Sequence, residues 1–290
     1  MEKIKGTGIA MITPFKKDLS VDYKSLEKLI KHQVEGGIDY IVLMGTTGES
    51  SVLSHNEKKE IIHFCIKKIN KKIPIVLGIG GNNTSQLVAE IKSTDFSGID
   101  AILSVSPCYN TPTQEGIYQH YKVISEASPL PIILYNVPGR TSSNISDKTT
   151  LRLANDFRNI IAIKEASGDF NQIMNIINNK PNDFIVISGD DAITLPLIYI
   201  GAEGVISVIA QSHPEEYSNM VKFAREGKIN EANEIHYKIY PLYEPIYIEG
   251  NPVGIKACLE LLGLCESQVR LPLIKGSEKI KNQLKKILTK

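Results

Sequence analysis

The sequence lacks tryptophan and shows almost no excess of charge of either sign. Its 33 basic residues nearly balance its 32 acidic residues, so the chain has no broad positive field to hold a nucleic acid or an anionic membrane surface. No apolar run approaches the length of a membrane span, and the N-terminus lacks the apolar stretch of a signal peptide. We therefore expect a soluble, cytoplasmic protein that binds small molecules, with no nucleic-acid or membrane partner.

Cysteine is also scarce, and its spacing excludes the common metal sites. None of the four cysteines forms a close C-x-x-C pair, and none stands near a histidine at a spacing typical of metal ligands. Asp190 and Asp191 are paired carboxylates, but no histidine or third acid accompanies them at a suitable spacing. The sequence therefore predicts no metal site and reduced thiols at Cys65, Cys108, Cys258 and Cys265.

Short apolar runs, in contrast, recur along the whole chain of 290 residues. They are rich in β-branched residues and alternate with longer segments of helical periodicity. Their near-continuous apolar character is typical of parallel strands buried on both faces. The runs cover residues 8–13, 40–44, 73–77, 101–105, 132–135, 160–164, 184–188 and 205–208.

Eight strands that alternate with helices predict a closed (β/α)8 barrel, the TIM-barrel fold of the α/β class. A doubly wound open sheet would usually have fewer strands and a Gly-rich nucleotide loop after the first one, and no such loop follows residues 8–13. Ser54 and Glu57 have the spacing of a capping box and predict the start of a helix.

Beyond Val208 the pattern is purely helical, which exceeds the single helix needed to complete a barrel. We therefore expect a catalytic barrel over residues 1–225 and a small C-terminal helical appendage over residues 226–290. The helices expected after the last strand cover residues 214–226, 229–247 and 252–262.

In barrels of this kind the active site lies at the C-terminal ends of the strands. Lys164 ends the sixth run, where its amine would project into or above a mainly apolar interior. Burial favours the neutral amine, the form that attacks a carbonyl, whereas a lysine that reaches the rim or pairs with Glu165 is the alternative. Tyr135 ends the neighbouring fifth run and is either a proton shuttle or a tyrosine that bridges core and loop.

Loops at the same end of the barrel offer candidate sites for carboxylates. The loop 45–50, GTTGES, combines small residues with hydroxyls and is either an anion-binding loop or a tight turn. Arg140 can make a bidentate contact with a second carboxylate, or it is a solvated surface arginine. Tyr109 offers a hydroxyl near the mouth and also suits a subunit interface. Together these positions favour a Schiff-base enzyme.

Five motifs occur in order along the chain: GTTGES (45–50), YNVPGRT (135–141), IKEASG (163–168), SGDD (188–191) and GVISV (204–208). With these motifs the chain resembles the dihydrodipicolinate synthase family of bacterial lysine and diaminopimelate biosynthesis, from residue 6 to about residue 273. The resemblance implies a lyase without a cofactor. In it, Lys164 forms a covalent imine with pyruvate, and the enamine then attacks the aldehyde of L-aspartate 4-semialdehyde.

The resemblance also implies the catalytic roles around that lysine. Tyr135 matches the proton donor and acceptor, while Thr46 and Tyr109 match the relay that connects it to solvent. In the family, the tyrosine that corresponds to Tyr109 comes from the neighbouring subunit. Tetramers made of two dimers are usual there, so the resemblance implies a homotetramer, although dimers also occur.

For the substrate-binding residues, the resemblance assigns the pyruvate carboxylate to Thr47 and the carboxylate of the semialdehyde to Arg140. Gly189 and Ile206 match residues that line the pocket. Asn251 matches a residue that helps to place the region of the lysine.

Many family members are inhibited by lysine, which binds at a subunit interface through an aromatic residue, an acid and a histidine. Here Cys108 occupies the aromatic position, Gln86 that of the acid and Lys58 that of a second histidine. Three further positions, Ser51, His55 and Asn82, remain compatible. We expect weak or absent inhibition, because the ammonium group of lysine would lose its anionic partner and meet a like charge.

Two other functions remain open from the sequence. One is another pyruvate lyase of the same superfamily, such as N-acetylneuraminate lyase or a keto-deoxy sugar acid aldolase, but Arg140 favours a short second carboxylate over a polyhydroxylated chain. The other is a non-catalytic barrel that binds pyruvate-like acids. The joint presence of Lys164, Tyr135, Thr46 and Tyr109 argues against it.

Overall fold

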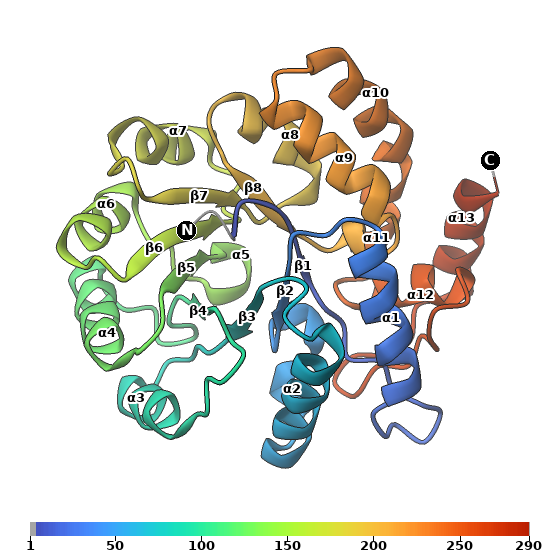
Figure 1. Ribbon diagram of the computed structural model, residues 1–290, viewed down its shortest axis with the longest axis horizontal. Coiled ribbons are helices and arrows are strands. Elements are labelled where there is room, and N and C mark those ends of the chain that lie inside the picture. Colours follow the sequence, from blue (N-terminus) through green and yellow to red (C-terminus); the bar gives the residue numbers. More distant parts are fainter. Residues whose placement is uncertain (1–3, 290) are drawn as a thin grey trace.

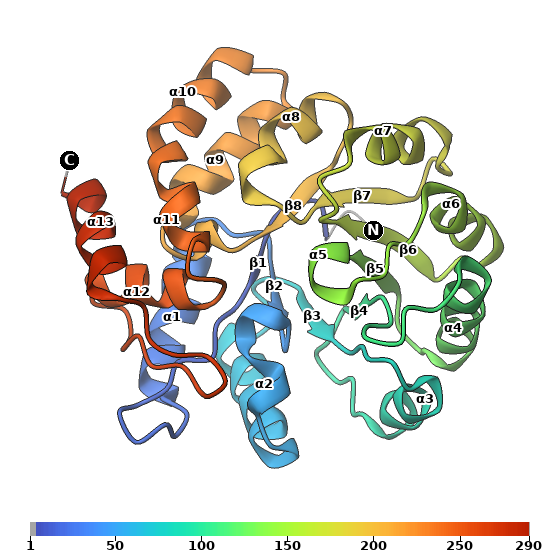
Figure 2. The same cartoon turned by 180° about the vertical axis from the view of Figure 1, so that it is seen from behind.

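The computed structural model describes residues 4–289 and contains one closed barrel of eight parallel strands (Figures 1 and 2). Each strand pairs with the next one in the sequence, and the last strand pairs with the first to close the barrel. The (β/α)8 barrel predicted from the sequence is confirmed. The strands are β1 (Gly6–Ala10), β2 (Tyr40–Leu43), β3 (Ile75–Gly78), β4 (Ala101–Val105), β5 (Ile132–Asn136), β6 (Ile160–Glu165), β7 (Ile185–Ser188) and β8 (Gly204–Ser207).

Each predicted apolar run overlaps a strand, but the first run begins within its strand and continues well beyond it. β1 ends at Ala10, whereas the apolar run reaches Thr13. Past Ala10 the chain leaves the strand ladder: the Ile12 amide donates to the side chain of Gln211 at 2.9 Å, and the Thr13 hydroxyl donates to the Gly48 carbonyl at 2.7 Å. These residues stay buried, which explains why hydrophobicity alone placed the end of the strand too late.

Helices enclose the barrel on its outer side (Figure 1). The predicted capping box is present at the start of the second helix, where Ser54 and Glu57 bond to each other's backbone N–H groups. The helices are α1 (Tyr23–Glu35), α2 (His55–Ile69), α3 (Thr84–Ser93), α4 (Gln114–Ala127), α5 (Pro138–Thr141), α6 (Asp147–Asp156), α7 (Phe170–Asn179), α8 (Thr194–Tyr199), α9 (Pro214–Arg225), α10 (Ile229–Ile239), α11 (Tyr243–Tyr247), α12 (Val253–Leu261) and α13 (Glu278–Leu288).

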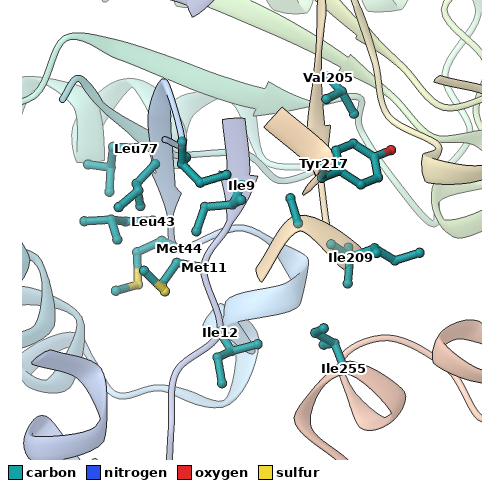
Figure 3. Packing of buried hydrophobic residues seen from close by; sticks show 14 of the residues in the cluster. Ile9, Met11, Ile12, Leu43, Met44, Leu77, Val205, Ile209, Tyr217 and Ile255 are labelled. Atoms are coloured by element: carbon teal, nitrogen blue, oxygen red, sulfur yellow. The ribbon is translucent and has the colours of Figure 1, made fainter. Parts of the chain in front are cut away.

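Side chains that alternate along each strand form two apolar layers. The inner layer fills the barrel and includes Ala10, Val42 and Ile206, while the outer layer lies between strands and helices. Figure 3 shows part of the outer layer, in which Ile9 of β1 lies in the same cluster as Ile255 of α12. The C-terminal region therefore shares the core of the barrel.

That C-terminal region departs from the helices expected over residues 229–247. α10 ends at Ile239, and a short 3-10 turn, η6 (Tyr240–Leu242), separates it from α11, because Pro241 cannot continue a helical hydrogen-bond ladder. α13 was not predicted, although Ser277 caps it and Ile280 and Leu284 form its buried face. The boundary between barrel and appendage at residues 225 and 226 stays a prediction.

α12 and α13 pack against each other and lie beside α1, outside the ring of barrel helices (Figures 1 and 2). Lys28 of α1 donates a hydrogen bond of 2.6 Å to the Gly263 carbonyl, just past the end of α12. In the part of the chain that the structure describes, no helix is long and apolar enough to cross a membrane.

Candidate active site

A cavity of about 770 Å³ opens at the C-terminal ends of the strands. Its walls come from strand ends, from the loop after β2, from α5 and from the segment around η6 and α11. It brings together predicted site residues that lie far apart in the sequence. Those that line it are Thr46, Thr47, Tyr135, Arg140, Lys164, Gly189 and Asn251.

Lys164 and Tyr135 lie side by side at the base of this cavity. They are register partners on the paired strands β5 and β6, and the Lys164 Nζ atom is 4.3 Å from the centre of the Tyr135 ring. Only 5% of Lys164 is exposed. An amine and a phenol therefore meet in a site that is largely shielded from solvent, which suits proton transfer to and from groups bound to the amine.

Glu165, the next residue, faces away from the barrel interior and does not pair with Lys164. Its carboxylate accepts hydrogen bonds from the side chains of Asn136, at 3.0 and 3.1 Å, and of Gln172, at 2.9 Å. The Ser167 amide donates a further bond of 2.8 Å. Burial raises the pKa of Glu165 despite these hydrogen bonds. This arrangement ties the end of β6 to β5 and α7, and it excludes the Lys164–Glu165 pair considered as an alternative.

Gly189 follows β7 and leaves room for the lysine side chain. A Cβ atom at this position would lie 2.9 Å from Lys164 Cε and 2.7 Å from Ala166 Cβ. The Gly189 amide also donates a 2.7 Å hydrogen bond to the Glu165 carbonyl, which holds the two chain segments close together. Glycine is therefore required here for packing against the lysine rather than for an unusual backbone angle.

The loop after β2 presents Thr46 and Thr47 to the cavity in a short 3-10 turn, η2 (Thr46–Gly48). The side-chain amide of Asn251 donates a hydrogen bond of 2.8 Å to the Thr47 hydroxyl oxygen. With this bond accepted, the Thr47 hydroxyl proton is free to be donated to a carboxylate in the cavity. Asn251 thus orients Thr47 from a segment 204 positions later in the chain.

Arg140 lies in α5, and it is exposed at the cavity wall. A planar guanidinium group in this place can bind a carboxylate with two parallel hydrogen bonds. The cavity therefore brings together the Lys164 amine, the Tyr135 phenol and two separate groups suited to carboxylates.

The structure does not bring two of the predicted site residues to the cavity wall. Tyr109 is 90% exposed and is absent from the lining residues. Ile206 is buried in the inner apolar layer of the barrel and is also absent from the lining. A contribution of Tyr109 to the site requires a second copy of the chain and stays a prediction.

The cavity also contains residues that the sequence did not single out, from η6 and α11. Tyr243, Glu244 and Tyr247 line it, and the Tyr247 hydroxyl donates a 2.5 Å hydrogen bond to the Asp191 carboxylate. The same carboxylate oxygen accepts the backbone amide of Val208 at 3.0 Å. The pKa of Tyr247 is raised well above its ordinary value, mainly by burial and to a lesser degree by the nearby Asp191 charge. These residues follow a helix break and carry no motif that would have indicated them.

A second cavity, of about 920 Å³, lies between α2 and the neighbouring strand ends and shares Thr46 and Tyr135 with the first. His55 and Lys58 line it, whereas Cys108 does not. The expected weakness of lysine inhibition stays a prediction. Among residues 4–289, no group of three or more His, Cys, Asp or Glu side chains is placed to hold a metal ion.

Comparison with known proteins gives matches over nearly the whole chain. A 4-hydroxy-tetrahydrodipicolinate synthase of Flavobacterium psychrophilum is 52% identical over 284 residues, covering 98% of this chain and 97% of the relative. One of Parabacteroides distasonis is 51% identical over 291 residues, covering 99% and 98%.

Solved structures agree with these relatives. A dihydrodipicolinate synthase from Aquifex aeolicus superimposes with a TM-score of 0.94 at 40% identity, covering 99% of this chain and 97% of that one. A dihydrodipicolinate synthase from Acinetobacter baumannii complexed with pyruvate gives 0.95 at 42% identity, covering 99% and 98%. The model of the dihydrodipicolinate synthetase family matches residues 3–290. The chain therefore belongs to the dihydrodipicolinate synthetase family.

Proposed function

We propose that this protein condenses pyruvate with L-aspartate 4-semialdehyde to form 4-hydroxy-tetrahydrodipicolinate, a step of diaminopimelate and lysine biosynthesis. The observation that carries the proposal is the buried Lys164 amine, 4.3 Å from the Tyr135 ring centre, in a cavity that also presents Thr47 and Arg140. Pyruvate and the semialdehyde each carry one carboxylate and one carbonyl, so the site offers a matching group for each.

The first half of the reaction takes place on pyruvate. The neutral Lys164 amine attacks the keto carbon, and the resulting carbinolamine loses water to leave an iminium ion. Tyr135 accepts the proton from the amine and donates one to the departing hydroxyl. The Thr47 hydroxyl, held by Asn251, donates to the pyruvate carboxylate and fixes its orientation. The Tyr135 phenolate left by this loss of water then takes a proton from the methyl group, which converts the iminium ion into an enamine.

The second half joins the two substrates. The enamine carbon attacks the aldehyde carbon of the semialdehyde, whose carboxylate Arg140 holds through paired hydrogen bonds. The new alkoxide takes a proton from the relay of Tyr135, Thr46 and Tyr109. The amino group of the former semialdehyde then attacks the iminium carbon, which closes the ring and releases the Lys164 amine.

The proposal includes an assembly of copies, a homotetramer, and a cytoplasmic location. Tyr109 can reach a cavity only in a neighbouring copy, and exposed Tyr199, Ile200 and Tyr237 offer apolar surface for contacts between copies. The cysteines are free thiols, the state that reducing compartments maintain. Sedimentation velocity of the wild-type chain and of Tyr109→Phe measures the assembly.

The chemistry is tested by trapping with borohydride in the presence of pyruvate, followed by mass spectrometry of the peptides. We expect an adduct on Lys164 that is lost in Lys164→Ala and kept in Lys148→Ala, which replaces an exposed lysine of α6 as a control. An adduct that persists in Lys164→Ala would overturn the assignment of the amine.

The second substrate is tested with a panel of aldehydes and a saturating concentration of pyruvate. We expect turnover of L-aspartate 4-semialdehyde in preference to N-acetylmannosamine and glyceraldehyde. Arg140→Ala should raise the KM of the semialdehyde by about tenfold or more, since it removes a charged hydrogen-bonding partner. Faster condensation with a sugar aldehyde would instead assign the barrel to another pyruvate lyase activity.

A further inference from the structure

Glu49 lies directly after the turn that presents Thr46 and Thr47, yet it does not line the cavity. Its backbone is in the left-handed region, with φ of 53°, and its side chain is 2% exposed. The turn therefore directs an acidic side chain into the protein interior rather than into the active site. A buried carboxylate needs compensating partners, since charge is costly to remove from water.

Both partners of this carboxylate come from the C-terminal region. Lys256 of α12, which is 0% exposed, places its Nζ atom 2.5 Å from Glu49 Oε1. The backbone amide of Arg270 donates to Glu49 Oε2 at 3.0 Å. The two contacts span 207 and 221 positions of the sequence.

Further contacts hold the Lys256–Glu49 ion pair in place. Lys256 also donates to the Gln268 carbonyl at 2.8 Å, and its Nζ atom lies 4.2 Å from the centre of the Phe15 ring. The guanidinium group of Arg270 is 4.4 Å from the centre of the same ring. Two cations thus pack on one aromatic side chain, in the segment between β1 and α1.

The Arg270 side chain holds the far end of the same loop. It donates to the Val52 carbonyl at 3.0 Å and forms two hydrogen bonds with Glu57, at 2.9 and 2.5 Å. The loop between β2 and α2 is therefore fixed at successive points by the C-terminal region: Thr47 by Asn251, Glu49 by Lys256 and the Arg270 backbone, and Val52 by the Arg270 side chain.

We propose that Glu49, Lys256 and Arg270 are positioning residues that set the orientation of the Thr47 hydroxyl toward the pyruvate carboxylate. The inference rests on the proposed function in that it takes Thr47 as the group that binds this carboxylate. Glu49 is two residues from Thr47 in a tight turn, so a shift of its buried carboxylate moves the turn and redirects the hydroxyl. None of the three residues lines the cavity.

The decisive measurement is the dependence of borohydride trapping on pyruvate concentration, which needs no aldehyde. We expect Lys256→Met and Arg270→Met each to raise the pyruvate concentration for half-maximal trapping on Lys164 by about tenfold. The trapped amount at saturating pyruvate should remain within about twofold of wild type, because the amine itself is unchanged.

Lys281→Met is the matched control, since it breaks a 2.8 Å ion pair with Glu260 that joins α12 to α13 away from the loop. A purely structural role lowers the folded fraction and hence the trapped amount, without changing the pyruvate dependence. Lys256→Arg, which keeps the charge, should recover much of the wild-type affinity. If Lys256→Met does not fold, Arg270→Met decides, because its side chain is partly exposed.

Unchanged pyruvate dependence in the folded variants, or an equal change in Lys281→Met, would overturn the proposal. Failure of this positioning proposal can be distinguished from failure of the proposed function. Trapping on Lys164 without turnover of the semialdehyde would contradict the function and leave the positioning role measurable. Loss of trapping in the wild-type protein would remove the function itself, and with it the proposal.

Discussion

Gly189→Ala offers a direct test of how tightly the catalytic lysine is packed. The new Cβ atom would lie 2.9 Å from Lys164 Cε, 2.7 Å from Ala166 Cβ and 3.1 Å from the Glu165 carbonyl oxygen. Carbon atoms prefer separations of ~3.5–4.0 Å, so the lysine side chain must move by ~0.6–1 Å. The other two neighbours are a Cβ atom and a backbone oxygen, which cannot give way as easily as the lysine.

A displacement of this size should affect chemistry more than folding. Misplacement of a reacting group by ~1 Å can cost about 10²-fold in rate, whereas overpacking costs about 1–3 kcal/mol of stability. We therefore expect Gly189→Ala to lower kcat and the trapping rate on Lys164 by about 100-fold, while the chain stays folded. Stopped-flow trapping with borohydride measures the rate, and urea unfolding measures the stability.

Gly139→Ala provides the control, since a Cβ atom there would meet no atom within 4 Å although the residue lines the same cavity. It should leave the trapping rate within about twofold of wild type, as expected for a substitution without a steric conflict. A Gly189→Ala enzyme with an unchanged trapping rate would refute the reasoning, because it would mean that the lysine has room to spare.

Three further predictions follow from individual contacts. Tyr135→Phe should lower kcat by about 10²–10⁴-fold while a pyruvate adduct can still be trapped slowly, since the proton shuttle is lost but the amine remains. Hydrogen bonds from the Arg270 guanidinium hold the pKa of Glu57 at about 2, below its ordinary 4.5. The stability that Glu57 contributes is therefore fully present above pH 4.5 and is lost as the pH falls through 2. In Glu57→Gln, the free energy of unfolding should depend less on pH across that window. Lysine should inhibit weakly, because Lys58 lines the second cavity and would place a like charge near the ammonium group of the inhibitor. Micromolar inhibition in a rate assay would contradict this prediction.

The sequence was sufficient to predict the barrel and the adjacency of Tyr135 and Lys164 in its active site. Consecutive apolar runs pair in a parallel barrel, so residues that end the fifth and sixth runs had to be adjacent, and Tyr135 and Lys164 are register partners. The strand end at Ala10 was not predictable in the same way, because burial continues after the ladder stops.

Long-range side-chain pairs had no signal in a single sequence. Nothing in the composition of α12 indicates that Lys256 reaches Glu49, since a helical lysine is usually solvated. The position of Tyr247 depends on the helix break at Pro241. Hydrophobic periodicity did not indicate this break and predicted one continuous helix there. Local patterns thus located most of the strand ends, whereas contacts between distant segments required the fold.

These contacts bear on how far the barrel and the C-terminal region are independent. Without the Lys256 amine, the buried Glu49 carboxylate would be unpaired, and an unpaired buried charge costs about 3–5 kcal/mol. Such a cost is a large share of a net stability of about 5–15 kcal/mol. A chain that ended at Arg225 would lose Lys256, would remove Ile255 from the core that it shares with Ile9 and would release Thr47 from Asn251. The barrel alone therefore lacks both part of its core and the fixed loop for pyruvate, so the C-terminal helices are needed for the site to form.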